Sequence, residues 1–470
     1  MTDHSQRATS PRLITLVVVG AAFLSGIDLF IVNVAFDEIG RDFAADGDAP
    51  SLSQLSWVLN AYAVVFAALL VPMGRLTDRY GRKAGFVAGL VLFTVASAAC
   101  GLSTGVWQLV GFRGLQAVGA AAMTPASLGL LLAALPAERK APAARLWALT
   151  GALAAALGPA VGGGLVQISW HWAFWINLPL GVLLVVGAVR FVPDVRHNEG
   201  APRPDLVGAA LVALAVGALV LGLVQGNEWG WSSARVLTAF VLAVLAVAAF
   251  AWLTGHHASP VIDPALLRVR SFSWASITTL VFNAGFGAGL LGGILWMQQV
   301  WGYSALRTGL AVALGPLLVP VTSIAVHRLL PRVRPGTLVV AGCLVSTVGA
   351  LVMAAQLTTT PSYWTTVVPG WALVGVAVGL AMPNLVATAT ASLPPEQAST
   401  GGGVVTMARQ VGLVLGVSVL VAIVGAGTPS VDSFRTAWLA VAGASLLAAA
   451  CATVIESSSR RSREPAPAAA

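Results

Sequence analysis

Residues 74–83 read Gly-Arg-Leu-Thr-Asp-Arg-Tyr-Gly-Arg-Lys and stand between two long apolar runs, residues 54–74 and 84–102. The stretch is too short to hold a domain, and its two glycines, Gly74 and Gly81, allow a tight turn. About 20 apolar residues are enough for a helix to cross the hydrocarbon core of a bilayer. The stretch therefore predicts a short charged connection between two membrane-spanning helices.

The composition of the whole chain is that of a membrane protein. Of 470 residues, 57% are hydrophobic and 9% are charged, whereas soluble domains carry about 25% charged residues. Fourteen runs are long and apolar enough to span a bilayer: 12–36, 54–74, 84–102, 106–134, 143–166, 172–190, 206–225, 236–254, 272–297, 308–326, 337–356, 363–388, 400–426 and 436–455. We predict an all-α integral membrane protein with 14 transmembrane helices.

The positions of lysine and arginine predict the orientation of these spans. Of the 26 such residues, Arg41, Arg235, Arg307 and Arg435 lie in loops after odd-numbered spans, and two lie inside spans. The other twenty lie in the tails and in loops after even-numbered spans, and loops rich in lysine and arginine stay cytoplasmic. We expect both termini to be cytoplasmic in a multi-pass protein of the plasma (inner) membrane. The net charge of +8 is scattered singly, so nucleic-acid binding is not expected.

Two parts of the chain resemble each other. In the first part, Leu70-Val71-Pro72 is followed by a basic connection and then by Ala88-Gly89. In the second part, Leu318-Val319-Pro320 is likewise followed by a basic connection and then by Ala341-Gly342. We predict two six-helix halves, an inserted helix pair and a disordered cytoplasmic tail, with boundaries at residues 1–192, 193–258 (linker and spans 7–8), 259–456 and 457–470. Repeated halves place a substrate site at their interface near the bilayer midplane.

Three ionisable residues fall deep inside spans: Asp28, Arg113 and Arg409. Such residues cost about 2.5–3.5 kcal/mol at mid-helix and are functional candidates for that reason. Asp28 and Arg113 lie at about the same depth, and Gln116 shares a helix face with Arg113. They form either a purely structural ion pair or a proton-coupling group in which Asp28 alternates between protonated and ionised forms.

Other polar and small residues inside spans suggest a cavity and a bend. Asn33, Asn283, Asn384, Arg409 and Gln410 are candidates for a substrate cavity, although each asparagine is equally suited to an interhelical hydrogen bond. Gly158 and Gly162 form a small-residue face on span 5, and Pro159 beside them bends the helix. Two explanations are open for this combination: close helix packing alone, or a position at the interface between two halves that move against each other. Two buried cations against one anion suit a neutral or partly anionic substrate.

The basic connection also has two interpretations. A positive-inside loop explains its arginines but not Asp78 among them. Asp78 can accept hydrogen bonds from a helix N-terminus or pair with a cation. The second interpretation is a conformational latch formed by Gly74, Asp78, Arg79, Gly81, Arg82 and Lys83.

Several motifs together resemble a known family. Residues 74–83 are similar to the signature loop of the major facilitator superfamily, and the stretch around Asp28 resembles the first-span motif of drug/proton antiporters. Arg113-Gly114-Leu115-Gln116 resembles their proton-coupling motif, with Ala117 where a glycine is usual. Gly158-Pro159-Ala160-Val161-Gly162-Gly163 resembles their antiporter motif. Trp170-His171-Trp172 and Asn177-Leu178-Pro179-Leu180-Gly181, with fourteen spans, indicate the 14-span, quaternary-ammonium-resistance type.

The resemblance implies a major facilitator fold and a proton-coupled exporter of a lipophilic drug-like compound or metabolite. We expect a monomer in the lipid bilayer with no cofactor other than protons as coupling ion and no metal. An enzyme is not expected, because no metal-ligand or catalytic grouping occurs at membrane depth. A narrow-specificity metabolite exporter and a transporter-fold sensor without transport remain alternatives, and a proton-coupled importer would not be expected to carry the span 5 motif.

Overall fold

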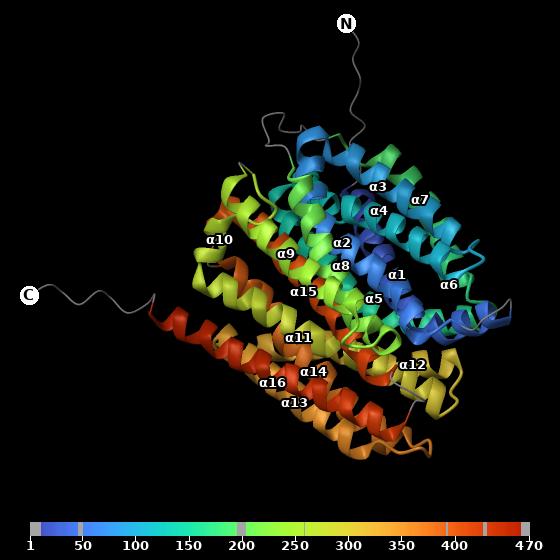
Figure 1. Ribbon diagram of the computed structural model, residues 1–470. Helices are drawn as coiled ribbons and strands as arrows, with labels where there is room; N and C mark the ends of the chain where they lie inside the picture. Colours follow the sequence, from blue (N-terminus) through green and yellow to red (C-terminus); the bar gives the residue numbers. More distant parts are fainter. Residues whose placement is uncertain are drawn as a thin grey trace, which may run out of the picture. The chain divides into compact units, whose positions relative to one another are not determined.

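The computed structural model describes residues 11–45, 50–194, 204–257, 259–391, 393–425 and 430–461. In these residues it is entirely helical, and 14 helical segments are long and apolar enough to cross a membrane (Figure 1). The predicted all-α architecture and number of spans are confirmed. Residues 195–203 of the predicted linker and 462–470 of the predicted tail lie outside the described residues.

Most spans are single helices, and three are joined from two segments. The elements are α1 (Pro11–Ala45), α2 (Leu52–Tyr80), α3 (Arg82–Cys100), α4 (Val106–Ala134), α5 (Ala137–Val166), α6 (Trp172–Trp175), α7 (Asn177–Phe191), α8 (Leu206–Trp229), α9 (Ala234–His256), α10 (Pro264–Arg268), α11 (Arg270–Leu295), η1 (Trp296–Val300), α12 (Ala305–Leu329), α13 (Pro335–Gln356), η2 (Tyr363–Val367), α14 (Val368–Ala391), α15 (Pro395–Val424) and α16 (Val431–Arg461). The joined spans are α6 with α7, α11 with η1, and η2 with α14.

Helix α1 continues beyond the apolar run that predicted it, which stops at residue 36. Arg41 pairs with Asp37 one turn earlier, a spacing that supports a helix. The indole Nε1 of Trp170 donates to Asp42 over 2.7 Å, and the Phe43 ring packs edge-on against the same indole. These contacts extend the helix to Ala45 because they satisfy polar side chains that the hydrophobic pattern does not include.

The connection between α2 and α3 is shorter than the ten-residue loop predicted from residues 74–83. Helix α2 ends at Tyr80 and α3 begins at Arg82, so Gly81 alone makes the turn. Its φ of 119° is a conformation that side-chain-bearing residues rarely adopt. The Gly81 N–H donates to the carbonyl of Thr77 over 3.0 Å and closes the end of α2. Most of the predicted loop is therefore helix.

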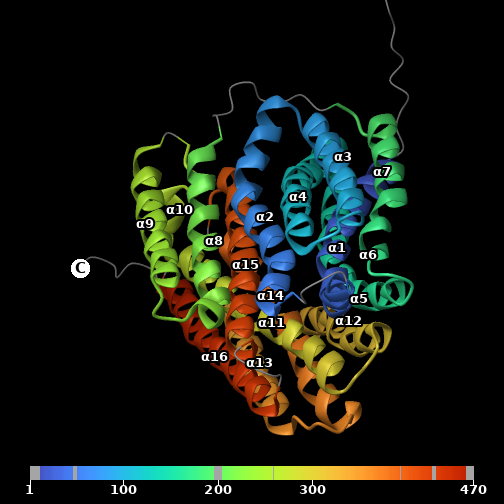
Figure 2. The ribbon, with the colours of Figure 1, turned by 45° about the vertical axis from the view of Figure 1, so that its right-hand side comes forward.

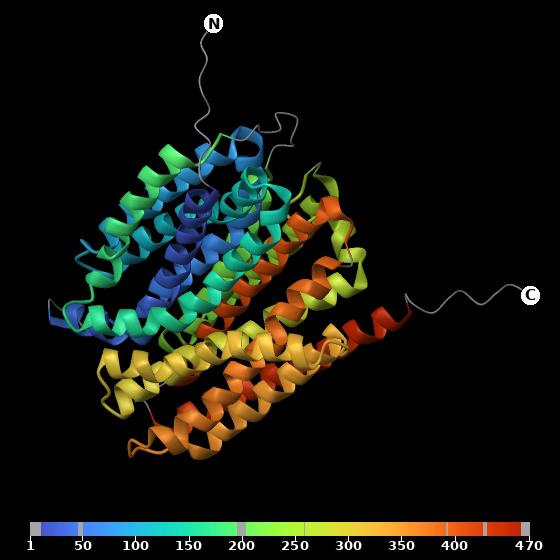
Figure 3. The ribbon, with the colours of Figure 1, turned by 180° about the vertical axis from the view of Figure 1, so that it is seen from behind.

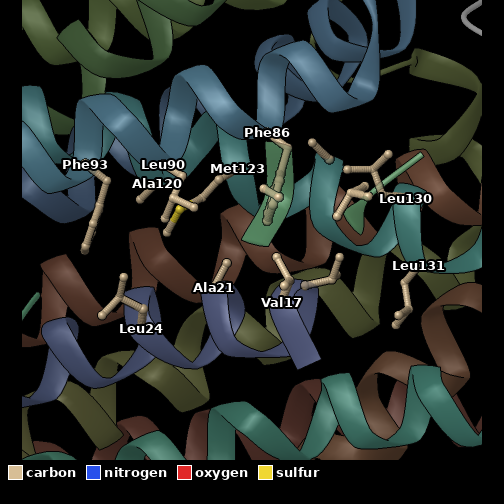
Figure 4. Packing of buried hydrophobic residues seen from close by; sticks show 14 of the residues in the cluster. Val17, Ala21, Leu24, Phe86, Leu90, Phe93, Ala120, Met123, Leu130 and Leu131 are labelled. Atoms are coloured by element: carbon tan, nitrogen blue, oxygen red, sulfur yellow. The ribbon is translucent and has the colours of Figure 1, made fainter. Parts of the chain in front are cut away.

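The chain forms two compact units. The first comprises Met1–Leu219, Ala239–Val261 and Gly302–Ala313. In this unit α3 lies beside α4 and α7 (Figure 2). Buried apolar side chains of α1, α3 and α4 meet in its core, among them Val17, Leu24, Phe86, Phe93, Met123 and Leu130 (Figure 4). In lipid, such packing holds helices together through van der Waals contact.

The second unit comprises Val220–Thr238, Ile262–Trp301 and Leu314–Ala470. Helix α11 packs against α15 and α16, and α13 packs against α14 and α16 (Figure 3). At Gly287 of α11 an added Cβ would lie 2.8 Å from the carbonyl oxygen of Leu413 on α15. Small residues at such contacts let two helix backbones approach closely.

The two repeated Ala-Gly pairs occupy equivalent places in the two units. A Cβ on Gly89 of α3 would lie 2.8 Å from the Gly119 carbonyl oxygen on α4. A Cβ on Gly342 of α13 would lie 2.8 Å from the Ala377 carbonyl oxygen on α14. Each Ala-Gly pair therefore lies where two helix backbones approach closely, α3 with α4 in the first unit and α13 with α14 in the second.

Replacing Gly89 by alanine should destabilise the first unit, because the added methyl group would meet backbone atoms of Gly119 and Met123. Overpacking of this kind costs about 1–3 kcal/mol. Gly111→Ala on α4 is the matched control, since nothing lies within 4 Å of its added Cβ. We expect a lower Tm of the purified protein for Gly89→Ala only; equal Tm values for both variants would contradict the close α3–α4 approach.

Candidate functional site

Asp28 of α1 is fully buried, and its carboxylate accepts three hydrogen bonds. Oδ2 accepts from Arg113 Nη1 of α4 over 2.6 Å. Oδ1 accepts from Gln116 Nε2 over 2.9 Å and from Asn177 Nδ2 of α7 over 2.8 Å. Asp28 and Arg113, which were predicted to lie at about the same depth, form a buried ion pair.

Arg113 is fully buried as well, and most of its guanidinium is occupied. Nη1 also donates to Gln116 Oε1 over 2.6 Å, and Nε donates to the Val58 carbonyl of α2 over 3.3 Å. The ring of Tyr62 lies 4.2 Å from its Cζ, at cation–π distance. Nη2 has no hydrogen-bond partner. Arg113 thus links α4 to α1 and α2 in one polar cluster.

Asn177 belongs to this cluster although the sequence analysis assigned it no role. Its Nδ2 donates both to Asp28 and to Ser97 Oγ of α3, the latter over 2.9 Å. Ser97 in turn donates to the Phe174 carbonyl over 2.9 Å. The break at Ile176 between α6 and α7 makes Asn177 the first residue of α7. An amide inside an apolar run was the available signal, but the sequence does not show which span it faces.

The hydrogen bonds suit the ionised form of Asp28. An ionised carboxylate only accepts, and all three partners donate to it. Three of the carboxylate's roughly four acceptor positions are thereby used. Loss of the carboxylate charge would leave Arg113 as an uncompensated buried cation, which is costly. Asp28 therefore serves in this structure as a shared acceptor through which α4 and α7 contact α1.

The predicted latch residues make contacts within the first unit. Asp78 pairs with Arg82, whose Nε donates to it over 2.6 Å; of the two partners considered for Asp78, the structure shows the cation. Arg82 also donates to the Gly129 carbonyl of α4 over 3.3 Å. Lys83 donates to the Val189 carbonyl of α7 over 3.1 Å. The pair is partly exposed and connects the ends of α2 and α3 to α4.

The remaining latch residues are placed as follows. Gly74 lies against Pro125 of α4, where a Cβ would be 3.3 Å from the proline ring. The guanidinium of Arg79 lies 5.6 Å from the Tyr80 ring. Arg75, which was not among the predicted residues, donates from Nη1 to both the carbonyl and the hydroxyl of Ser259 over 2.7 Å. This bond ties α2 to the segment after α9.

The small residues of α5 pack directly beside the polar cluster. A Cβ on Gly158 would lie 2.6 Å from Phe30 Cβ, and one on Gly162 would lie 3.1 Å from Ile31 Cα. Both neighbours follow Asp28 on α1 within one turn. Gly163 and Pro159 contact the first turns of α12, which group with the first unit. The small face predicted on span 5 therefore sets the position of α1.

The candidate cavity residues are not brought together by hydrogen bonds. Asn33, Asn283 and Asn384 each donate to the carbonyl four residues earlier in their own helix, over 2.9, 2.7 and 2.8 Å. Asn283 also lies 3.7 Å from the sulfur of Met382. Gln410 is buried, and its Oε1 has no partner. Arg409 Nε is buried and has no hydrogen-bond partner, and Arg409 is in none of the ion pairs found among the described residues.

Sequence comparison identifies the family. Residues 18–208 and 205–417 match the family described as Major Facilitator Superfamily. The chain belongs to this superfamily. Its members are transporters rather than enzymes, and no group of three potential metal ligands occurs among the residues described here.

Curated relatives extend over most of the chain. It is 33% identical over 419 residues to the multidrug resistance protein Stp of Mycobacterium tuberculosis (strain CDC 1551 / Oshkosh), covering 88% of this chain and 76% of that protein. It is 29% identical over 417 residues to a methylenomycin A resistance protein of Bacillus subtilis (strain 168), covering 88% of each. It is 30% identical over 419 residues to a tetracenomycin C resistance and export protein of Streptomyces glaucescens, covering 87% and 75%.

Solved structures share the fold. The transporter PepTSo of the POT family superposes with a TM-score of 0.71, at 15% identity, over 97% of this chain and 99% of that chain. The predicted major facilitator fold is confirmed, and this superfamily member is a multi-pass membrane protein with 14 candidate spans.

The buried ion pair should show strong coupling between its two partners. Arg113→Met leaves Asp28 without its cation, and removing one partner of a buried pair costs about 3–5 kcal/mol. Asp28→Asn combined with Arg113→Met removes both charges and should recover part of the lost thermal stability. Thermal unfolding of the purified single and double variants measures this. Additive losses would mean that the two charges do not stabilise each other.

Proposed function

We propose that this transporter is a proton-coupled exporter, in which protons moving inward through Asp28 drive a lipophilic small molecule outward. The single observation that carries the proposal is the carboxylate of Asp28, which is fully buried and held by three donors. When such a carboxylate binds a proton, it no longer balances Arg113, and the uncompensated buried cation favours a rearrangement. One proton moving down a 100 mV potential supplies about 2.3 kcal/mol, enough for a concentration ratio of roughly tens-fold.

The composition of the site favours protons as the coupling ion. Asp28 is the only acid deep inside a predicted span, and its charge is already balanced by Arg113. A metal cation would need several oxygen ligands, whereas a proton needs only one carboxylate oxygen. Gln116 is hydrogen-bonded to both Arg113 and Asp28. It is therefore suited to keep the two charged side chains in position while the proton enters or leaves.

The export direction and the substrate class are inferred from the relatives. Three of them are named for multidrug resistance, methylenomycin A resistance, and tetracenomycin C resistance and export. We extend to this chain only the shared feature, which is outward transport of drug-like small molecules. The chain would act as a monomer in the plasma membrane with cytoplasmic termini.

The predicted latch and the α5 face supply the parts of an alternating-access cycle. The Asp78–Arg82 pair is partly exposed, and exposed pairs contribute only about 0–1 kcal/mol, so it can open and close at little cost. The contact of Gly158 and Gly162 with α1 lies within one turn of Asp28. A displacement of α1 along this smooth face would therefore change the surroundings of the carboxylate.

Asp28→Asn should abolish transport driven by a pH gradient, because the amide takes up no proton in this range. The measurement is efflux of ethidium from proteoliposomes under an imposed pH gradient. Glu38→Gln is the matched control, since it removes an acid from the exposed end of the same helix. We expect Glu38→Gln to transport at the wild-type rate and Asp28→Asn to fall to the leak of empty liposomes.

The outcomes separate the alternatives. Gradient-driven efflux that persists in Asp28→Asn would refute coupling at this residue. A wild-type protein that moves neither ethidium nor any other lipophilic compound tested would indicate a transporter-fold sensor. Efflux of one endogenous metabolite alone would indicate a narrow-specificity exporter.

Asn177→Ala should slow gradient-driven efflux of ethidium without abolishing it. The substitution removes one of the three donors to the Asp28 carboxylate and the bond to Ser97 of α3, so the carboxylate is held less firmly. Asn227→Ala is the control, because Asn227 of α8 bonds the Ala422 carbonyl in the second unit and none of the cluster residues. A wild-type rate for Asn177→Ala would show that Asn177 serves only to pack α7.

A further inference from the structure

The second unit contains a membrane-embedded cation with no acid to balance it. Residues 264–395 and 397–431 contain no aspartate or glutamate, which leaves Glu396 as the one acid between α10 and α16. Glu396 precedes Arg409 by 13 positions on α15, or about 20 Å along a helix at about 1.5 Å per residue. No side chain of α11, α13 or α14 is able to supply a carboxylate to Arg409.

Arg409 differs in this respect from the other arginine inside a span. The charge of Arg113 is balanced by Asp28, and its guanidinium also donates to Gln116 and the Val58 carbonyl. Arg409 is the tenth residue of the span Thr400–Val424. Its Nε is buried without a hydrogen-bond partner, and its guanidinium forms no ion pair within the described part of the chain. An arginine fork has five donors arranged to match a planar anion.

Other unsatisfied polar atoms lie at the same level of the unit. Helices α11 and α15 run in the same direction, because Gly412 lies against Leu280 and Asn283, and Gly416 lies against Ala284. Arg409 lies about one turn before Gly412 on α15, so it is level with about residues 277–280 of α11. The hydroxyl of Ser276, one turn before Leu280 on the side of α11 that meets α15, is buried there without a partner, and so is Gln410 Oε1 on α15. Buried polar atoms are normally paired, so a partner from outside the chain is indicated.

We propose that Arg409 binds an acidic group of the transported molecule, so that the substrate class includes lipophilic organic acids. The hydroxyl of Ser276 is a candidate for an additional donor to that group. The inference rests on the proposed export function, which it narrows to a chemical class. Asp28 is already paired with Arg113 and is not free to balance Arg409, so an anionic group on the substrate would supply the missing charge.

The test is binding of dansyl-phenylalanine, a lipophilic carboxylate, and of its uncharged methyl ester to the full-length protein in lipid nanodiscs, with empty nanodiscs as background. Wild-type protein should bind the acid about tenfold more tightly than the ester, or more. Arg409→Gln should bind both alike. Arg409→Lys keeps the charge without the fork and should retain part of the preference. Arg435→Gln is the matched control, because it removes an arginine that pairs with Asp432 at the end of α16.

Binding does not depend on a proton gradient, so the two proposals fail separately. Equal wild-type affinity for acid and ester would overturn the anion site, as would a preference for the acid that persists in Arg409→Gln. Equal loss of both ligands in Arg409→Gln and Arg409→Lys would reduce Arg409 to a structural residue. Gradient-driven efflux of the cation ethidium reports on the export function alone. Arg409→Gln that still exports ethidium but not dansyl-phenylalanine would support both proposals.

Discussion

The buried ion pair between Asp28 and Arg113 is the interaction on which the first unit depends. Within a bilayer no water is present to satisfy a polar group, so each one needs a protein partner. The pair obtains its partners from several spans: Val58 on α2, Gln116 on α4 and Asn177 on α7. Each helix is thereby held at one depth and one rotation, since a shift of one residue would leave a charge unsatisfied.

Close backbone contacts make this convergence geometrically feasible. In lipid the hydrophobic effect contributes little to helix association, because the lipid tails are as apolar as the side chains. Small residues instead let helix backbones approach closely enough for van der Waals packing to hold them together. Gly158 and Gly162 bring α5 against α1 within a turn of Asp28, and Gly89 brings α3 against α4. These approaches depend on the absence of a side chain at each glycine, since an added Cβ would meet the neighbouring helix.

The two arginines inside spans show how burial and pairing determine a role. Both carry a charge that lipid disfavours, but Arg113 meets an acid and two further acceptors whereas Arg409 meets none among the described residues. A compensated charge stabilises a fold and can respond to a proton. A buried arginine that no acid of the protein balances is still able to bind an anion. In a transporter, such an arginine can select the substrate by its acidic group.

The amino-acid sequence determined the number of spans, because each crossing requires about 20 apolar residues in succession. It also determined that Asp28 and Arg113 share a depth, since counting residues from a span end measures distance along the membrane normal. The roles of Asn177 and Ser97, the pairing of Asp78 with Arg82 and the single-residue turn at Gly81 were decided only by tertiary structure. Hydropathy defines how deep a residue lies, but which helix it faces depends on the packing of spans that are distant in sequence.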